Sequence, residues 1–238
     1  MGAAPARGLA YNPAWDRHRT AGMQINADFS AAVTLDTRTL PWRPSPDGSV
    51  RRRMLDRIGD EVARATSIVR YPAGSRFPAH EHALGEEFLV LDGIFSDEHG
   101  DYPAGTYVRN PPGSAHTPRS APGCDLFVKL RQMPADEDRH VRIDTGDAAR
   151  QARRELLRLD LFDADYESVF LIASGTEPAR FEADSAAGFE ALVLSGGIEI
   201  GGARHGPMTW LRRPTAEGLV LDLAPDTRLW VKTGHLPG

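Results

Sequence analysis

The sequence predicts an all-β protein built from two barrels in tandem. Strand-like segments with alternating apolar residues recur along the chain, as at 65–71, 88–91 and 166–172. Three histidines and a glutamate are spaced so that only a barrel would bring their side chains together. An internal repeat then relates the first half of the chain to the second at one constant offset.

The strongest local signal is a pair of histidines, His80 and His82, in a segment that reads as a strand. Because side chains alternate across a strand, both imidazoles point to the same face and can share one ion. Residues 83–85 form a short turn, and Glu86 opens the next strand. That strand is expected to end at residues 92–93, where Asp-Gly is a hairpin turn signal.

A second segment supplies the remaining candidate ligand. Pro111, Pro112 and Gly113 predict a tight turn that delivers His116 to the start of a further strand. Imidazole and carboxylate groups suit zinc, iron, manganese, nickel or copper. The predicted metal ligands are therefore His80, His82, Glu86 and His116.

These segments resemble the two motifs of the cupins. The first motif, G-x5-H-x-H-x3,4-E-x6-G, runs from Gly74 to Gly93; the second, G-x5-P-x-G-x2-H-x3-N, begins at Gly105 and has Ser120 where asparagine is usual. The wider stretch 88–133 is similar to ChrR-type cupins, named for an anti-sigma factor whose C-terminal domain has this fold. The resemblance implies a double-stranded β-helix, or jelly roll, that binds one divalent metal through three histidines and one glutamate.

Two adjacent glutamates compete for the fourth ligand position. Only one of Glu86 and Glu87 can face the barrel interior, because neighbouring strand residues point in opposite directions. Both spacings occur in cupins, and the ChrR-type spacing favours Glu86. The nearby polar residues Asp92, Asp97, Glu98 and His99 are expected to be solvated hairpin residues rather than ligands.

The internal repeat has an offset of 103 residues. It relates 87–93 to 190–196, and Leu-Phe-Val-Lys at 126–129 to Leu-Trp-Val-Lys at 229–232, which contain the only two lysines of the chain. The second copy lacks the metal ligands. The positions equivalent to His80, His82, Glu86 and His116 hold Ala183, Ser185, Phe189 and Leu219. We expect a second barrel that is filled by its own side chains.

The repeat defines the expected domain organisation. We predict a loose tail at 1–22, a metal-binding ChrR-like cupin domain at 23–145 and a degenerate second cupin domain at 146–238. Residues 147–161 are predicted to form a short helix that links the barrels. Residues 51–64 carry apolar residues at helix-like spacing, although Gly59 weakens that interpretation.

Composition narrows the class of protein. The 238 residues carry a net charge of −5 and a pI near 5.9, which argues against nucleic acid as the main partner. No apolar run reaches the ~20 residues of a membrane span, and no secretory signal is recognisable. Cys124 is the only cysteine, so no intrachain disulfide can form and a cytoplasmic location is the simplest expectation.

Function is less constrained than fold, since one fold hosts many activities. The first hypothesis is a metal-dependent oxidoreductase, as the resemblance to cupin dioxygenases implies, acting on a small organic substrate, with Glu86 able to leave the metal and take a proton. The alternative is a zinc-bearing regulatory or sensor protein without catalysis. Capture of a sigma factor is disfavoured, because residues 1–60 hold no cysteine for the N-terminal zinc domain of such factors. A third interpretation is a purely structural zinc. A homodimer is compatible with exposed barrel sheets.

The sequence also indicates pocket-wall, packing and solvent-exposed residues. We expect Phe77, Phe88, Val90, Tyr107 and Phe127 to supply pocket walls, about half of them facing outward instead by strand parity. The lone thiol, Cys124, is expected to serve packing. The histidines outside the motifs, His140, His205 and His235, are expected to titrate in solvent.

Overall fold

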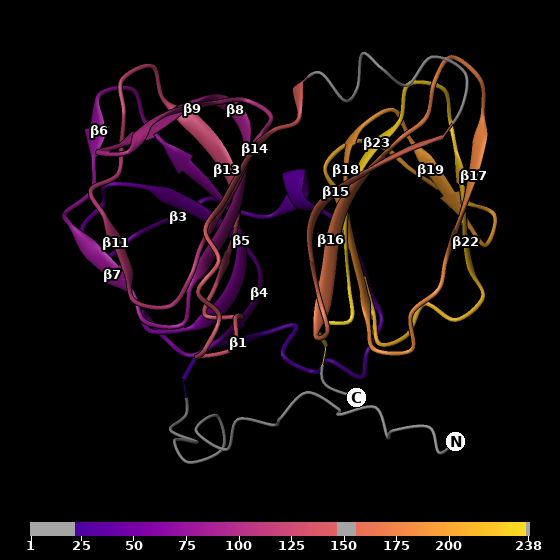
Figure 1. Ribbon diagram of the computed structural model, residues 1–238, viewed down its shortest axis with the longest axis horizontal. Helices are drawn as coiled ribbons and strands as arrows, with labels where there is room; N and C mark the ends of the chain where they lie inside the picture. Colours follow the sequence, from indigo (N-terminus) through magenta and orange to yellow (C-terminus); the bar gives the residue numbers. More distant parts are fainter. Residues whose placement is uncertain (1–21, 147–155, 237–238) are drawn as a thin grey trace.

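A computed structural model of the chain describes residues 22–146 and 156–236, and regular structure in these parts is almost entirely β-strand. Two barrels lie side by side, with the large sheet of one facing the large sheet of the other (Figure 1). Each barrel consists of a large sheet at this interface and a smaller sheet at the outer side. The predicted all-β class and tandem barrels are confirmed.

Barrel 1 holds the predicted metal site. Its large sheet has the strand order β1-β4-β5-β13-β8-β10-β14. The bounds of these strands are β1 Gln24–Ile25, β4 Arg51–Ile58, β5 Arg64–Tyr71, β13 Cys124–Leu130, β8 Glu86–Asp97, β10 Thr106–Asn110 and β14 Val141–Asp144. The shorter strands are β3 Arg43–Pro44, β6 Ser75–Arg76, β7 His80–His82, β9 Gly100–Pro103, β11 Ser114–His116 and β12 Arg119–Ser120.

Barrel 2 repeats this plan in the second half of the chain. Its large sheet has the order β15-β16-β23-β18-β21-β2, and its smaller sheet has the order β17-β22-β19-β20. The bounds are β15 Leu157–Ala164, β16 Glu167–Ala173, β23 Arg228–Thr233, β18 Phe189–Ser195, β21 Thr209–Arg213 and β2 Val33–Asp36. The smaller sheet contains β17 Ala179–Ala183, β22 Leu219–Leu223, β19 Ile198–Ile200 and β20 Ala203–His205. A 3-10 turn, η2 (Thr37–Thr39), follows β2.

Backbone geometry follows the same 103-residue repeat. Gly93 and Gly196 both have positive φ, 73° and 70°; Gly93 lies within β8, and Gly196 lies between β18 and β19. A Cβ on Gly93 would lie 2.0 Å from the Gly123 carbonyl oxygen, and one on Gly196 would lie 2.5 Å from the Thr227 Cα. Only glycine combines this backbone angle with such a close approach.

Two strand predictions hold and three local ones are wrong. Residues 65–71 and 166–172 form strands, as expected. The Asp-Gly at 92–93 is not a hairpin turn, because β8 continues through Gly93 to Asp97 with a bulge in its pairing to β13. Residues 51–58 form β4 rather than a helix, and Leu55 of this strand packs in the apolar cluster shared with barrel 2. Of the helix expected at 147–161, residues 157–161 belong to β15, and 147–155 fall outside the described residues.

The domain boundaries remain a prediction. Strand β2 belongs to the predicted first domain in sequence but to barrel 2 in space. Although β2 lies within 23–145, it pairs antiparallel with β21 of barrel 2. Strand β14, which precedes barrel 2 in the chain, pairs instead with β10 of barrel 1. Each barrel is therefore extended at one edge by a strand that precedes the other barrel in sequence.

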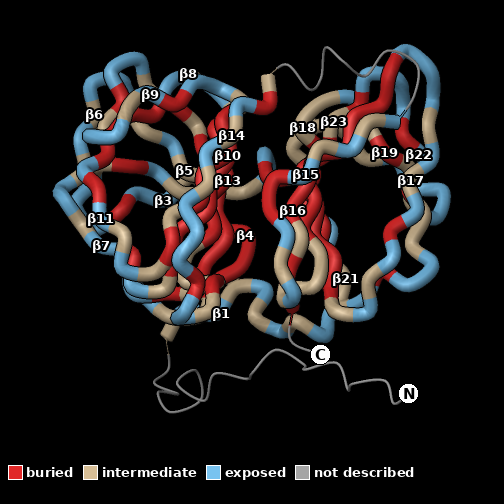
Figure 2. Tube along the Cα trace, in the orientation of Figure 1, coloured by how far each residue is buried: buried red, intermediate tan, exposed pale blue. Residues whose placement is uncertain are grey.

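A shared apolar layer joins the barrels. Leu55, Ile68, Leu89, Tyr107 and Phe127 of barrel 1 pack with Trp210 and Trp230 and further buried residues of barrel 2. The facing sheets are accordingly the most continuously buried parts of the molecule (Figure 2). Within the described residues, no helix has the length and apolar character needed to cross a membrane.

Candidate metal centre

Strands β7 and β11 bring the three histidines together. They pair antiparallel, with His80 opposite His116 and Ser114 opposite His82. Because alternate residues share a face, His80, His82 and His116 all point to the same side of this small ribbon. The predicted turn before β11 is present, since the Gly113 amide donates to the His82 carbonyl oxygen at 3.0 Å.

The imidazole nitrogens converge on one point. One ligand atom from each of His80, His82 and His116 can be chosen so that all lie within 4.8 Å of one another. The Nε2 atoms of His82 and His116 are 3.0 Å apart. His82 and His116 are buried and His80 is half-buried. Three histidines are thus placed to bind a metal ion.

Hydrogen-bond partners at Nδ1 orient two of the imidazole rings. The Nδ1 atom of His80 lies 2.9 Å from the Pro78 carbonyl oxygen, and Nδ1 of His116 lies 3.2 Å from Oδ2 of Asp97. An imidazole that donates its proton through Nδ1 keeps a lone pair on Nε2, the atom that faces the other rings. Carboxylates and carbonyls are the usual partners behind metal-binding histidines.

Glu86 of β8 approaches two of the three histidines. Its Oε2 atom lies 3.3 Å from Nε2 of His82 and 3.6 Å from Nε2 of His116. The Asn110 side chain, opposite Glu86 in the pairing of β8 with β10, donates to the same oxygen at 3.2 Å. Glu87 points out of the barrel, where it meets Lys232 of barrel 2. The structure brings Glu86, and not Glu87, to the histidines.

Asp97 corrects one expectation. It was expected to be a solvated hairpin residue, but it is 3% exposed because β8 continues past Gly93 and returns its side chain to the interior. Besides His116, it accepts hydrogen bonds from the Tyr102 hydroxyl at 3.0 Å and from the His99 amide at 2.8 Å. Of its polar neighbours, Glu98 and His99 are exposed and fit the expectation.

Burial, hydrogen bonds and nearby charges shift the pKa values of His82, His116 and Asp97. Burial lowers the pKa of His82 despite the attraction of Glu86, which favours the neutral imidazole that a metal requires. Burial also opposes protonation of His116, but the hydrogen bond with Asp97 and the charge of Glu86 outweigh it, so that its pKa is raised. For Asp97 burial raises the pKa, and the hydrogen bond from His116 with the bonds from His99 and Tyr102 outweighs it, so that the pKa is lowered.

A cavity of about 380 Å³ adjoins the site on the side of β10 and β14. It reaches His82 and His116, and its other walls are a mixture of apolar and polar side chains. These walls are formed by Asp97, His99, Tyr102, Val108, Arg109, Asn110, Ser114, Ala115, His140, Val141 and Arg142. The buried hydroxyl of Ser114, which lines the cavity, has no hydrogen-bond partner within the described part of the chain.

The five residues expected as pocket walls divide by strand parity as anticipated, but none of them lines the cavity, so their assignment as pocket walls is wrong. Phe88 and Val90 face the interior of barrel 1 with Phe95 and Tyr102, whereas Tyr107 and Phe127 face the second barrel. Phe77 packs edge-on against His80, with ring centroids 5.0 Å apart.

Cys124 lies in the apolar core of barrel 1, where burial raises the pKa of its thiol to about 11. The thiol is therefore protonated and unreactive at neutral pH, in agreement with a packing role.

Among the histidines outside the motifs, His235 was wrongly expected to titrate in solvent. Its side chain is 3% exposed, and its Nε2 lies 2.9 Å from Oε2 of Glu190. Burial lowers its pKa to about 3, although Glu190 opposes the shift. His140 is exposed and His205 is half-buried.

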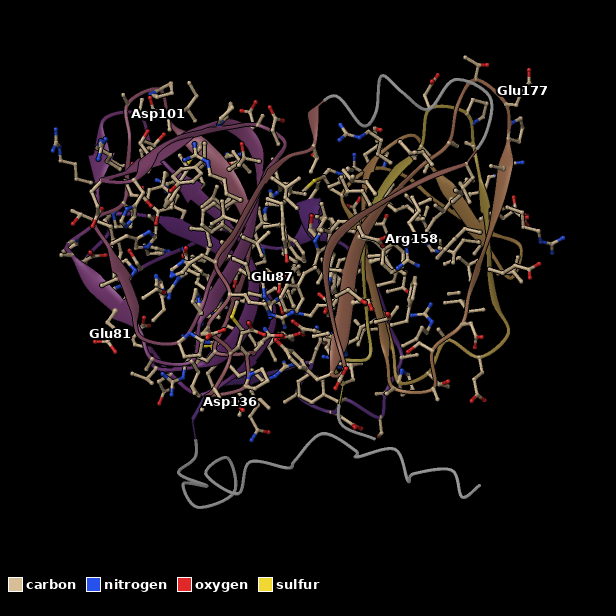
Figure 3. All side chains as sticks on the ribbon, in the orientation of Figure 1. Glu81, Glu87, Asp101, Asp136, Arg158 and Glu177 are labelled. Carbon is tan, nitrogen blue, oxygen red and sulfur yellow. The ribbon has the colours of Figure 1, made fainter. Side chains whose placement is uncertain are left out.

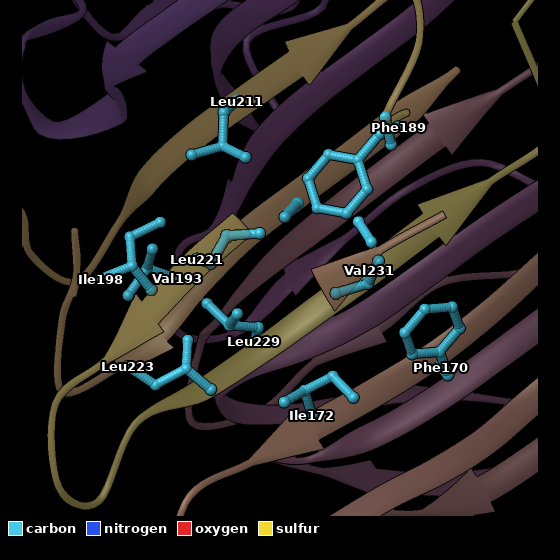
Figure 4. Packing of buried hydrophobic residues seen from close by; sticks show 13 residues of the cluster. Phe170, Ile172, Phe189, Val193, Ile198, Leu211, Leu221, Leu223, Leu229 and Val231 are labelled. Atoms are coloured by element: carbon cyan, nitrogen blue, oxygen red, sulfur yellow. The ribbon is translucent and has the colours of Figure 1, made fainter. Parts of the chain in front are cut away.

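Barrel 2 is filled where barrel 1 has ligands. Ala183 pairs with Leu219 across β17 and β22, as His80 pairs with His116 across β7 and β11. Ala183 and Phe189 belong to a closed apolar cluster, and Leu219 packs against it. Figure 4 shows Phe189 among Phe170, Leu221 and Val231. The prediction of a barrel filled by its own side chains is confirmed.

Comparison with known proteins agrees with this description. Residues 30–134 match the model of the ChrR Cupin-like domain family. Curated protein sequences gave no match to the chain.

Solved structures of cupin-fold proteins match over most of the chain. A bacterial pirin, YhhW, from Escherichia coli in complex with nickel(II) has a TM-score of 0.63 at 14% identity, covering 87% of this chain and 99% of its own. The protein Ylba from Escherichia coli has a TM-score of 0.63 at 13% identity, covering 93% and 96%. A salicylate 1,2-dioxygenase from Pseudaminobacter salicylatoxidans has a TM-score of 0.58 at 9% identity, covering 86% and 84%. At these identities the likeness concerns the fold.

Proposed function

We propose that this protein is a metal-dependent oxidoreductase of the dioxygenase type, which acts on a small organic substrate in barrel 1. The observation that carries the proposal is the convergence of three imidazoles and the Glu86 carboxylate beside a cavity. The ligands proposed are His80, His82, Glu86 and His116, binding one divalent ion per chain. Zinc or iron fits best, and manganese, nickel or copper would also suit this donor set.

The donor spacing fits a single metal ion. Two atoms that are each about 2.1 Å from a tetrahedral ion stand about 3.4 Å apart. Here Nε2 of His82 lies 3.0 Å from Nε2 of His116 and 3.3 Å from Oε2 of Glu86, while His116 and Glu86 are separated by 3.6 Å. An Nδ1–H of His116 that donates to Asp97 leaves the Nε2 lone pair of His116 to face such an ion.

A metal ion bound at this point would offer open coordination positions to a substrate oxygen and dioxygen, or would activate a water molecule. The side chains around it have separate tasks. Glu86 would be the ligand able to detach and accept a proton, and Asn110 donates a hydrogen bond to its Oε2 atom. Asp97 fixes the His116 ring through Nδ1. The salicylate dioxygenase with a similar fold supports this class of reaction.

The cavity limits the substrate in size. A volume of about 380 Å³ is at the small end of ligand pockets. Val108, Val141 and Tyr102 give it apolar walls, and the unpaired hydroxyl of Ser114 can bind a polar group of the ligand. A small molecule with one or two oxygen functions would fill such a space.

The proposal is tested by oxygen uptake. The protein reconstituted with Fe(II) would be assayed in an oxygen electrode with small diketones and hydroxylated aryl ketones. Substrate-dependent uptake that the His116→Ala variant lacks would support the oxidoreductase. Absence of uptake with every metal and substrate of the panel, from a protein that binds metal stoichiometrically, would contradict it.

A zinc-bearing regulatory protein without catalysis is the second candidate. The match of residues 30–134 to the ChrR Cupin-like domain favours it, as does a donor set of four groups that can close a tetrahedron around zinc. Zinc that is retained through purification, with no oxygen uptake, would select this candidate.

A further inference from the structure

The interface between the barrels contains two buried ion-pair clusters that the 103-residue repeat relates to each other. In the first cluster, Lys232 of barrel 2 binds Glu87 of barrel 1 at 2.7 Å. In the second, Lys129 of barrel 1 binds Glu190 of barrel 2 at 2.6 Å. Both lysines of the chain thus form ion pairs across the interface, and each barrel supplies the cation for the other barrel's glutamate. All four side chains are at most 3% exposed.

The first cluster forms a closed ring of alternating charge. Lys232 also binds Glu167 of its own barrel at 2.8 Å, Arg109 binds Glu167 at 2.6 Å, and Arg109 returns to Glu87 at 3.2 Å. The Tyr107 hydroxyl donates to the second oxygen of Glu87 at 3.1 Å. The two cations and the two anions of the ring are drawn equally from the two barrels, and Lys232, Arg109 and Tyr107 hold the Glu87 carboxylate from several directions. Figure 3 places Glu87 between the barrels.

The ring contains the strand residues that lie next to the pair facing the metal centre. Strands β8 and β10 pair so that Glu87 lies opposite Arg109 and Glu86 lies opposite Asn110. On the interface side, the pair Glu87–Arg109 is fixed by barrel 2. On the interior side, the next pair, Glu86–Asn110, presents its oxygen to His82 and His116. Because adjacent side chains of a strand leave opposite faces, restraint of Glu87 fixes the backbone from which Glu86 extends.

The second cluster has no such consequence. The residue beside Glu190 is Phe189, which is buried in the apolar cluster of barrel 2. Glu190 is held by Lys129, Trp210 and His235 rather than by a ring. The chain therefore contains its own control: two repeat-related, buried lysines, of which only Lys232 binds the glutamate that is adjacent to a metal-facing residue.

We propose that barrel 2, although it lacks metal ligands, positions the metal centre of barrel 1 through Lys232. The ion pair of Lys232 with Glu87 restrains the strand and thereby sets the orientation of Glu86. Lys232 is a positioning residue, and the inference rests on the proposed metal site. Groups that orient metal ligands from behind commonly contribute tenfold to hundredfold in metal affinity. This gives the filled barrel a role in the chemistry of its neighbour.

The test compares Lys232→Met with Lys129→Met in the full-length protein. Zinc affinity would be measured by competition with a chromogenic chelator, and urea unfolding of the metal-free proteins would establish that the two variants lose similar stability. Lys232→Met should weaken zinc binding about tenfold, Lys129→Met by less than threefold, and Lys232→Arg should retain most of the wild-type affinity. Equal effects of the two methionine variants on affinity, within threefold, would overturn the inference.

A milder pair of variants serves if a buried lysine proves indispensable for folding. Tyr107→Phe removes only the hydroxyl that binds Glu87, and Thr66→Val removes the hydroxyl that accepts from Lys129 at 3.0 Å. Tyr107→Phe should weaken zinc binding at least threefold, and Thr66→Val should leave it unchanged; the same affinity in both would overturn the inference. A wild-type protein that binds no zinc would instead refute the proposed metal site itself, and the inference with it.

Discussion

Replacement of Asp97 by asparagine probes how the protein controls a metal-facing imidazole. The Asp97 Oδ1 atom accepts from the Tyr102 hydroxyl and the His99 amide, and Oδ2 faces Nδ1 of His116 at 3.2 Å. Asparagine has nearly the same shape and can keep Oδ1 in place. Its amide nitrogen would then face the Nδ1 proton of His116, so that two donors oppose each other.

The conflict is relieved when His116 moves its proton to Nε2, the atom that would bind the metal. A metal ion must then displace that proton or the ring must turn. The expected loss is tenfold to hundredfold in metal affinity, which corresponds to about 1.4 to 2.7 kcal/mol. Because the shape of the side chain is preserved, the far-ultraviolet circular dichroism of the metal-free variant should match that of the wild type.

Glu98→Gln provides the control for this experiment. It removes one negative charge at the neighbouring residue, whose exposed carboxylate accepts from the Thr117 amide at 2.8 Å. Competition titration with zinc at pH 7.5 should give Glu98→Gln an affinity within about threefold of the wild type, since exposed charges are screened by solvent. If Asp97→Asn bound zinc as tightly as Glu98→Gln, the assigned role of Asp97 would be refuted.

Three further predictions concern the metal ligands and the buried interface. His80→Ala or His116→Ala should remove bound metal and lower the melting temperature of the metal-loaded protein, and stoichiometric metal in both variants would rule out the site. Glu86→Gln should weaken metal binding much more than Glu87→Gln, because Oε2 of Glu86 faces the histidines; the reverse order would move the ligand by one residue. The pKa of His235 is lowered to about 3 by burial, from an ordinary value of 6.5. As the pH falls through 6.5, the unfolded chain takes up a proton that the folded chain excludes, so the free energy of unfolding should decline between pH 6.5 and 3, by at most about 1.4 kcal/mol per pH unit from this group. His235→Gln should flatten that decline in urea titrations, and an unchanged slope would show that His235 is protonated in the folded state.

The repeat and the ligand spacing were readable from the sequence because each depends on local rules. Alternation across a strand is enough to place His80 and His82 on one face, and to assign Glu86 and Glu87 to opposite faces. The 103-residue offset extends to the backbone, as the positive φ of Gly93 and Gly196 shows. Such features need no knowledge of how distant parts of the chain meet.

Tertiary contacts decide what local patterns could not. Asp97 appeared to belong to a hairpin because Asp-Gly normally ends a strand, yet β8 continues through Gly93 to Asp97 and the carboxylate is buried. His235 lies near the end of the chain in a polar sequence, and only the return of that segment to Glu190 buries it. The two lysines were visible as part of the repeat, but their exchange between barrels follows from the packing of two sheets.

Metal analysis of the purified, untagged chain tests the central claim most directly. Elemental mass spectrometry of protein that has been freed of loosely bound ions should find about one equivalent of divalent metal per chain, lost in His80→Ala. Two equivalents would mean that barrel 2 also binds metal, despite the apolar cluster around Phe189. No bound metal, and none taken up from an excess of zinc or Fe(II), would contradict the account.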